Sequence, residues 1–247
     1  MPVFFLPSQC ITPPTVSVTG EFLRHLRNSL RIKVGETILV TDGEDRRYRT
    51  VITSITKQSM TGRVIEIIPR PPRRAPSLIL GQSLVKGEKM GWVIQKTTEL
   101  GVQTIIPIQS RQSIVRLKAD RVEAQIVRWQ RIAREAAQQS EQWRVPTIAR
   151  PRSLLSCVTQ PSDRSLSLIL TERLDRLATL SSIQLPPLLE GSILVLVGPE
   201  GGWTEEEVMS AQEAGAIPIT LGTKILRAET AAILVMGILQ YRLGELG

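Results

Sequence analysis

The sequence contains few of the residues that build disulfide frameworks and metal sites. It has two cysteines, Cys10 and Cys157, and a single histidine, His25, in 247 residues. Two distant cysteines exclude a disulfide scaffold and a cysteine-rich zinc site, and one histidine excludes a multi-histidine metal site. A Ser-His-Asp triad would have to use His25. We therefore expect no bound metal, and we expect a reducing compartment, the cytoplasm.

The sequence also lacks a segment typical of export or membrane insertion. Residues 1–10 have no basic start and no long apolar core, and they contain two prolines, so they do not match a signal peptide. The apolar stretch within residues 230–242 is too short to cross a bilayer as a helix. We expect no membrane partner.

Acidic residues are fewer than basic ones. The chain has 23 Asp and Glu against 31 Lys and Arg, which gives a formal net charge of +8. An excess of positive charge favours a polyanionic partner, and it favours nucleic acid over a membrane surface. The alternative is an ordinary basic surface, and charge by itself does not decide between the two.

The first 70 residues predict a small β-barrel. Thr41-Asp42-Gly43 is a hairpin turn signal, and residues 21–30 predict one short helix bordered by Arg24, Arg27 and Arg31. These arginines could form a basic rim that contacts RNA, or they could form a solvated helix face. Segments with the β-branched and alternating character of strands occur at residues 16–19, 37–40, 48–55 and 61–68.

A proline-rich segment divides the chain. Four prolines fall within residues 69–76, and a segment of this kind is a stiff linker, which we place at residues 71–76 between domains at 1–70 and 77–247. Beyond it strands alternate with helices, which predicts an α/β domain with a mostly parallel sheet. The strands are expected at residues 78–85, 102–108, 166–170, 193–197 and 217–221, and the helices at 88–100, 119–139, 204–215 and 230–242.

Three loops are the candidate walls of a ligand site. They are Thr171-Glu172, residues 198–202 and residues 222–227, and each follows a predicted strand. Ligands of parallel α/β sheets bind beyond the carboxyl ends of the strands. We therefore expect these loops to meet around one site.

The turn at residues 198–202 does not match a phosphate-binding loop. It follows neither the dinucleotide fingerprint nor the P-loop pattern, and Pro199 removes a backbone N–H. Thr204 and Glu207 form a capping box signal for the next helix, whose first turn is acidic. These carboxylates could be only partners of the helix dipole. With Glu200 they would also repel phosphate, while a cationic or zwitterionic ligand would be tolerated.

Two motifs carry a resemblance to a known family. Residues 196–202 read LVGPEGG and residues 221–230 read LGTKILRAET. With KGEKM at residues 86–90, they closely resemble the RsmE family of SPOUT (trefoil-knotted) 16S ribosomal RNA methyltransferases. The resemblance implies a PUA-like RNA-binding barrel, a knotted domain and a homodimer. It also implies transfer of a methyl group from S-adenosylmethionine to N3 of uridine 1498 in 16S rRNA of the small ribosomal subunit.

The resemblance also implies site residues. RNA contacts are expected at Arg24, Arg27, Arg31, Arg111, Arg116 and Arg144. The chain has Gln112 and Gln142 where the family usually has arginine. The cofactor pocket is expected at Thr171, Leu196, Val197, Gly198, Gly201, Leu221, Gly222, Ile225, Leu226 and Thr230.

The chemistry of a uracil imide suggests catalytic roles for three residues. A carboxylate, Glu229 or Glu200, could accept the N3 proton, and the guanidinium of Arg227 could stabilise the charge that develops on a carbonyl oxygen. Alternatively, Arg227 and Glu229 form a structural pair, or Glu229 caps the last helix. At the level of function, the rivals are methylation of a ribose 2′-hydroxyl and a non-catalytic RNA-binding assembly factor.

The last predicted helix gives an independent reason to expect a homodimer. Its residues are apolar on nearly every face through Leu239. One sheet face covers only part of a helix circumference, so the remaining side must meet other elements or a second copy.

Overall fold

The computed structural model describes residues 3–20, 22–24, 32–159, 164–172, 177–187 and 191–247. The chain divides into two compact units. Unit 1 contains residues 1–72 and 137–145, and unit 2 contains residues 73–136 and 146–247.

Unit 1 is built on a curled β-sheet. Among its described residues the strand order is β1-β4-β5-β6-β3-β2, and all neighbours are antiparallel except β1 and β4. The register shifts twice between β5 and β6, and such irregularities bend a sheet. The strands are β1 (Val3–Phe5), β2 (Ile11–Thr12), β3 (Thr15–Thr19), β4 (Thr37–Thr41), β5 (Arg46–Ile55) and β6 (Ser59–Pro69).

The predicted β-rich character of this region is therefore confirmed. Apolar residues of alternate strand positions, among them Val16, Val18, Ile38 and Val40, form its core. The predicted hairpin joins β4 to β5, and Gly43 in its turn has a φ of 89°. The predicted helix over 21–30 lies mostly outside the described residues, as do Arg27 and Arg31.

Residues 137–145 belong to unit 1 although they are distant from it in sequence. The buried Arg47 guanidinium lies 3.9 Å from the centroid of the Trp143 ring, and its Nη2 donates to the carbonyl oxygen of Glu141 at 2.6 Å. Arg144 Nη2 lies 3.2 Å from Asp45 Oδ1. No local sequence pattern indicates this return, because these partners are about a hundred residues apart.

Unit 2 is an α/β domain with a parallel sheet, as expected. Its order is β11-β13-β10-β12-β7-β8-β9 in the described part of the chain, and all neighbours are parallel. The strands are β7 (Ser77–Ser83), β8 (Thr104–Ile108), β9 (Thr147–Ile148), β10 (Arg164–Leu170), β11 (Ala178–Thr179), β12 (Ser192–Val197) and β13 (Ile217–Thr220). β12 is central and every residue in it is buried, which explains its unbroken apolar run.

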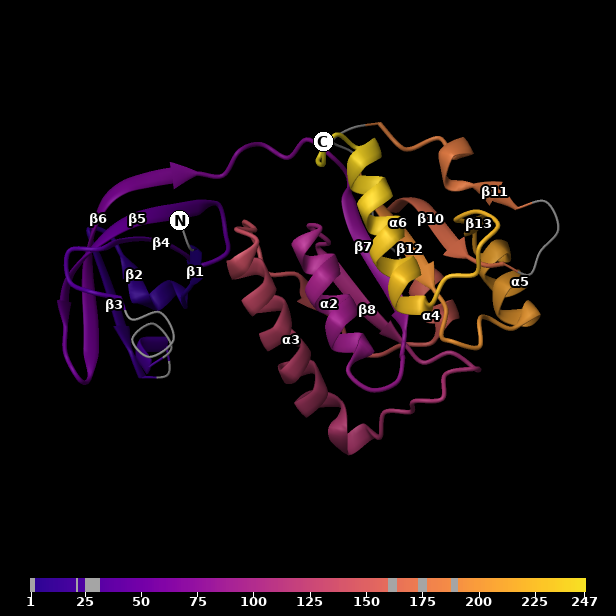
Figure 1. The fold of residues 1–247 in the computed structure, drawn as a ribbon, viewed down its shortest axis with the longest axis horizontal. Helices are drawn as coiled ribbons and strands as arrows, with labels where there is room; N and C mark the ends of the chain where they lie inside the picture. The colour runs from indigo at the N-terminus through magenta and orange to yellow at the C-terminus, as the bar shows by residue number, and fades with distance from the viewer. Residues whose placement is uncertain (1–2, 21, 25–31, 160–163, 173–176, 188–190) are drawn as a thin grey trace. The chain divides into compact units, whose positions relative to one another are not determined.

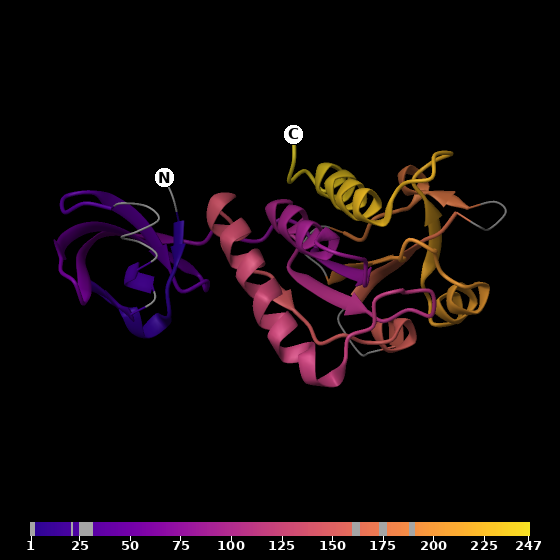
Figure 2. The same cartoon turned by 60° about the horizontal axis from the view of Figure 1, so that its bottom comes forward.

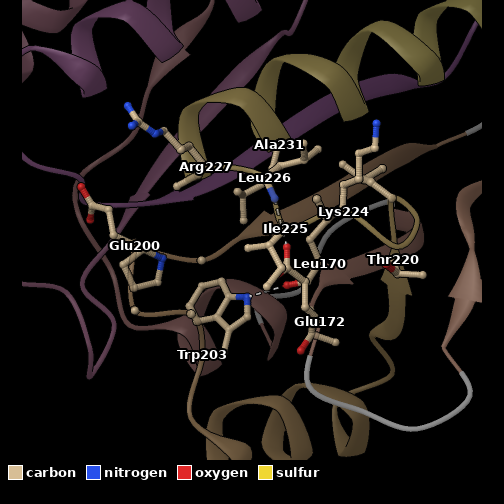
Figure 3. A pocket seen from close by; sticks show the side chains of 18 of the residues that line it. Leu170, Glu172, Glu200, Trp203, Thr220, Lys224, Ile225, Leu226, Arg227 and Ala231 are labelled. Carbon is tan, nitrogen blue, oxygen red and sulfur yellow. Dashed lines mark hydrogen bonds between the residues drawn. The ribbon is translucent and has the colours of Figure 1, made fainter.

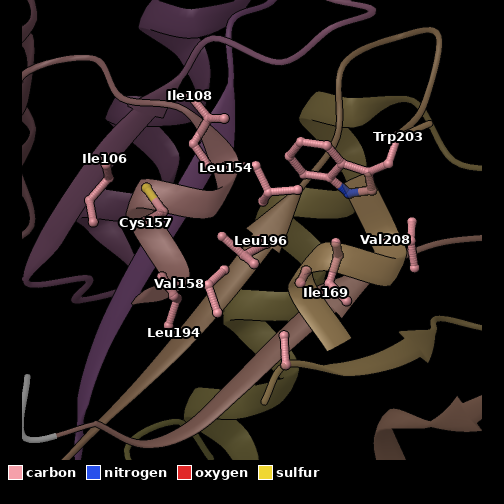
Figure 4. Packing of buried hydrophobic residues seen from close by; sticks show 12 residues of the cluster. Ile106, Ile108, Leu154, Cys157, Val158, Ile169, Leu194, Leu196, Trp203 and Val208 are labelled. Atoms are coloured by element: carbon pink, nitrogen blue, oxygen red, sulfur yellow. The ribbon is translucent and has the colours of Figure 1, made fainter. Parts of the chain in front are cut away.

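Helices cover both faces of this sheet. Figures 1 and 2 show α2, α3 and α6 on one face and α4 and α5 on the other. On the second face Leu154 and Cys157 of α4 and Val208 of α5 pack against Leu194 and Leu196 of β12 (Figure 4). The helices are α2 (Lys89–Glu99), α3 (Val122–Gln139), α4 (Leu154–Thr159), α5 (Glu205–Glu213) and α6 (Ala228–Arg242).

Within the described residues, every helix is too short or too polar to span a membrane.

Candidate active site

The three predicted loops meet at one cavity of about 550 Å³, a size typical of small-molecule sites. They follow β10, β12 and β13, of which β10 has the other two as its neighbours. Because the strands are parallel, their carboxyl ends lie at one edge of the sheet. Figure 3 shows Glu200 and Arg227 extending on the same side of the cavity, away from Lys224.

Trp203 fixes the turn at residues 198–202. Its side chain is buried, and its Nε1 donates to the carbonyl oxygen of Leu170 at 3.1 Å (Figure 3). A Cβ atom on Gly198 would lie 3.3 Å from this Nε1, so a larger residue would press on the indole. The indole therefore joins the turn after β12 to the end of β10.

The predicted capping box of α5 is present. Thr204 Oγ1 accepts from the Glu207 backbone N–H at 3.2 Å, and Glu207 Oε2 accepts from the Thr204 N–H at 3.0 Å. Glu207 Oε1 also accepts from the Arg111 backbone N–H at 2.9 Å. Glu207 thus holds both the start of α5 and the loop after β8.

The loop at residues 221–227 is held by fewer contacts. Leu226 N–H donates to Glu172 Oε1 at 3.4 Å, and Thr220 Oγ1 accepts from the Gly222 N–H at 3.2 Å. Ile225, in the middle of this loop, is 84% exposed although it lines the cavity. An aliphatic side chain in that position is available to cover a ligand.

An ammonium group connects two loops of the site. Lys89 Nζ lies 3.3 Å from Glu229 Oε1 and 3.6 Å from Glu200 Oε1. Glu200 belongs to the turn after β12, and Glu229 belongs to α6. Lys89 lines the cavity with its side chain about one-third exposed, while the Glu229 side chain is 6% exposed.

Glu200 is held in its ionised form. Partial burial by itself raises the pKa of this carboxyl group. Hydrogen bonds from the backbone N–H groups of Glu200 and Lys86, together with the positive charge of Lys89, outweigh that effect and keep the pKa below its ordinary value.

The position expected for Glu229 is corrected. The last helix was expected to begin at residue 230, which would leave Glu229 in the loop that precedes it, but α6 begins at Ala228, so Glu229 lies in the first helical turn and is buried. Arg227 is the N-cap residue, and both residues after it are compatible with a helix, so the helix starts earlier than predicted. Among the described residues Glu229 pairs with Lys89 and not with Arg227.

The cavity contains many but not all of the predicted site residues. Of the proposed catalytic residues, Arg227 and Glu200 line it and Glu229 does not. Leu196 is outside because its side chain packs under α4 and α5, and Gly222 and Thr230 also lie outside the lining. The predicted cofactor residues that line the cavity are Thr171, Val197, Gly198, Gly201, Leu221, Ile225 and Leu226.

The proposed RNA-contact arginines are exposed wherever they are described. Arg24 and Arg116 are exposed, Arg111 forms an ion pair with Glu206, and Arg144 forms ion pairs with Asp45 and Glu44. Gln112, one departure from the family pattern, touches the glycine turn. A Cβ atom on Gly201 would lie 2.7 Å from Gln112 Oε1.

Sequence reasoning assigned no role to several residues that line the cavity: Lys89, Trp203 and Lys224. Lys89 was part of the KGEKM motif that supported the resemblance, but its distance along the chain from Glu200 and Glu229 gave no sign of their pairing. Trp203 directly follows the glycine turn, but a single aromatic residue belongs to no sequence motif that would assign it a role. In the part of the chain that the structure describes, no three His, Cys, Asp or Glu residues cluster closely enough to hold a metal ion.

Comparison with known proteins agrees with this geometry. The family model described as an RNA methyltransferase domain matches residues 73–240, and the model described as an RNA methyltransferase PUA domain matches residues 18–65. Ribosomal RNA small subunit methyltransferase E of Bacillus subtilis is 32% identical over 232 residues, which covers 93% of this chain and 91% of the relative. The chain belongs to the RsmE family of ribosomal RNA small subunit methyltransferases.

Solved RsmE-like structures share the whole fold. The Neisseria gonorrhoeae ribosomal RNA small subunit methyltransferase E, bound to S-adenosyl methionine, is 32% identical with a TM-score of 0.86 and covers 98% of both chains. A Legionella pneumophila structure with the bound cofactor SAM is 26% identical, with a TM-score of 0.87 and 97% coverage of both chains.

Proposed function

We propose that this RsmE family member transfers a methyl group from S-adenosylmethionine to N3 of a uridine in 16S rRNA, within the small ribosomal subunit in the cytoplasm. The family target, uridine 1498, is the expected nucleotide. One observation carries the proposal. The turn at residues 198–202 and the loop at residues 221–227 form one cavity, in a chain that shares its fold with relatives solved with this cofactor.

The cavity is chemically suited to a sulfonium cofactor. Glu200 and Glu172 place carboxylates in its walls, and Pro199 contributes no N–H to the turn. The sulfonium of a zwitterionic ligand would meet favourable charge beside these carboxylates, and its own carboxylate would meet favourable charge at Lys89, Lys224 or Arg227, which also line the cavity. The Gly198–Gly202 turn and the Trp203 indole supply a rigid wall, and Ile225 supplies apolar surface from the opposite loop.

The proposed roles around the target base follow from exposure. Arg227 lines the cavity, is exposed, and has no ion-pair partner among the described residues, so its guanidinium is free to meet a carbonyl oxygen of uracil. Of the two carboxylates proposed as the base, Glu200 is the one that can meet a bound base, because Glu229 is buried and outside the lining. The low pKa of Glu200 makes it a weak base.

Substrate RNA is proposed to contact the basic residues Arg24, Arg27, Arg31, Arg111, Arg116 and Arg144. If these residues neutralise phosphates, replacing several of them with glutamine should weaken binding to small subunits and flatten its salt dependence, while cofactor affinity stays the same. An unchanged salt slope would show that they form only a solvated surface.

A homodimer is proposed to cover an apolar stripe on α2 and α6. The single chain already buries Val235, Met236 and Leu239 of α6 completely. The large apolar side chains of these helices that it leaves exposed include Leu234 at 40%, Tyr241 at 69%, and Trp92 of the adjacent α2 at 50%. Sedimentation should show a dimer at low micromolar concentration, and Leu234→Asp should shift it toward monomer with loss of activity. A fully active monomer would contradict this proposal.

The function is tested with unmodified small ribosomal subunits and labelled S-adenosylmethionine. Nucleoside mass spectrometry of the product should show 3-methyluridine. A 2′-O-methylated nucleoside would instead support the ribose alternative, and no transfer to subunits or free 16S rRNA would overturn the proposed substrate. Arg227→Met should lower the transfer rate by about 10²-fold, which is typical of losing one group that stabilises developing charge.

A further inference from the structure

The two carboxylates proposed as the base, Glu200 and Glu229, are poorly suited to remove a proton from uracil. The pKa of Glu200 is held low, which leaves little driving force for accepting a proton. Glu229 is buried, its Oε2 is shielded and has no hydrogen-bond partner, and it does not line the cavity. With neither of these two as a strong base, the site can favour loss of the N3 proton in another way.

Stabilising the anion is that other way. When the N3 proton of uracil leaves, negative charge spreads onto O2 and O4, which flank N3 on its two sides. One cation can meet only one of these oxygens well. Two cations that line the same cavity, with one at each carbonyl oxygen, therefore stabilise the anion more than one cation does.

Lys89 and Lys224 are the other cations that line the cavity with Arg227, and Figure 3 shows Lys224 extending away from Arg227, which leaves Lys89 as the candidate partner. Carboxylates from two different segments flank its ammonium, with Glu200 Oε1 at 3.6 Å and Glu229 Oε1 at 3.3 Å from Nζ. An ammonium has three N–H donors. Two carboxylates can take at most two of these donors in single hydrogen bonds, which leaves one for a ligand, and the side chain is one-third exposed on the cavity wall.

We propose that Lys89 is a catalytic residue whose ammonium, together with the Arg227 guanidinium, stabilises the uracil imide anion, with one cation at each carbonyl oxygen. This inference rests on the proposed function. In the step, the N3–H bond breaks and its proton passes to water. The electron pair on N3 forms the new bond to the methyl carbon, and the bond from sulfur to that methyl breaks with its pair returning to sulfur.

The charged groups around Lys89 come from several segments. On its own side, Glu88 is exposed and lies 4.0 Å from Arg128. Glu200 faces Lys89 from the turn after β12, and Glu229 faces it from α6. Arg227, Lys224 and Glu172 line other parts of the same cavity. Glu200 and Glu229 are thus the anions that any change at Lys89 leaves unpaired.

The competing explanation is structural. Lys89 could serve only to neutralise the buried Glu229 carboxylate, since removing one partner of a buried pair leaves an uncompensated charge. The two roles differ in their dependence on pH. Losing a cation that contacts the substrate makes the imide harder to ionise, so the rate is recovered at higher pH. Losing a purely structural partner lowers the rate at every pH. It does not shift the part of the pH–rate profile in which the rate rises as the substrate ionises.

The experiment compares wild type, Lys89→Met and the control Lys96→Met in single-turnover methylation of small subunits across a range of pH. Lys96 lies on the same helix, two turns away, and pairs with Glu99 outside the cavity, so its replacement removes the same charge. We expect Lys89→Met to slow methyl transfer by about 10²-fold at neutral pH. We also expect the rising part of its pH–rate profile to shift to higher pH by about one pH unit. Lys96→Met should match wild type, and cofactor affinity measured by calorimetry should stay unchanged in both.

A double variant separates the two explanations. Lys89→Met with Glu229→Gln removes the ammonium together with the buried carboxylate charge that would otherwise stay uncompensated. If Lys89 acts on the substrate, the double variant transfers methyl groups as slowly as Lys89→Met, and its pH–rate profile is shifted to the same higher pH. If its role is to pair with Glu229, the rate returns, and that result overturns the proposal. The double variant also carries the comparison if Lys89→Met alone fails to fold.

Other outcomes are equally decisive. If Lys89→Met loses the same fraction of its methyl-transfer rate at every pH, or if it loses cofactor affinity, then Lys89 does not stabilise the uracil anion and the proposal is overturned. The product made by wild type distinguishes this from failure of the proposed function. If wild type makes no 3-methyluridine, the proposed function is wrong. If wild type makes 3-methyluridine and Lys89→Met has a normal rate, only the role proposed for Lys89 is wrong.

Discussion

The two loops that frame the cavity differ in how firmly the rest of the chain holds them. The turn at residues 198–204 is tied by the buried Trp203 indole and by the Thr204–Glu207 capping box. The loop at residues 221–227 has a weaker hydrogen bond, 3.4 Å from Leu226 N–H to Glu172, and its Ile225 is exposed. The comparison indicates a rigid wall that is ready before binding and a cover that can adjust to the ligand.

Replacing Trp203 with alanine should have the largest effect. The side chain is 4% exposed and belongs to the core between the sheet and α4 and α5. Loss of a buried tryptophan typically costs about 3–5 kcal/mol in the free energy of unfolding. Urea denaturation monitored by circular dichroism measures this, and cofactor affinity should fall with it. A loss below about 1 kcal/mol would show that this turn is no more firmly held than the other loop.

Glu207→Gln should have an intermediate effect. The carboxylate accepts from the backbone N–H groups of Thr204 and Arg111, and an amide side chain offers only one acceptor oxygen for these two donors. We expect a loss of about 1–2 kcal/mol in the free energy of unfolding. Glu206→Gln is the matched control, because its ion pair with Arg111 is exposed and should contribute at most about 1 kcal/mol. Equal losses in the two variants would contradict the role assigned to Glu207.

Ile225→Ser tests the adjustable loop. Because the side chain is exposed, the free energy of unfolding should change by no more than about 0.5 kcal/mol. Cofactor affinity, measured by calorimetry, should still fall by up to about tenfold, because the ligand would bury this side chain. Met209→Ser, which removes an exposed apolar side chain from α5 outside the cavity lining, should leave affinity unchanged. Normal affinity in Ile225→Ser would mean that the loop does not close over the cofactor.

Glu200→Gln should have the smallest effect on stability, and that effect should depend on pH. The folded-state pKa of Glu200 is lowered from its ordinary value of 4.5, so its ionised form stabilises the fold above that pH. The advantage of wild type over the variant should be small at neutral pH, because the side chain is partly exposed. It should disappear as pH falls through the lowered pKa. Thermal unfolding between neutral and acidic pH measures the difference, and a constant difference would contradict the ion pairs assigned to Glu200.

The same two loops show how far sequence reasoning reaches. The wall at residues 198–204 was predictable, because a buried apolar strand, a glycine turn and a capping box are local patterns of neighbouring residues. The start of α6 was predicted two residues too late, since nothing local forbids a helix at Ala228. That small error moved Glu229 from a loop into a buried helical turn and changed what the residue can do.

The sequence by itself determined the parallel α/β domain, the β-rich first unit, the glycine turn with its capping box, and the resemblance to the RsmE family. All of these depend on periodicity or on contiguous motifs. Only the tertiary structure decided that Lys89 pairs with both Glu200 and Glu229, that Trp203 binds the end of β10, and that residues 137–145 join the first unit. The physical reason is that these contacts link residues tens to more than a hundred positions apart. Packing of the sheet and its helices brings them together, and no local pattern records it.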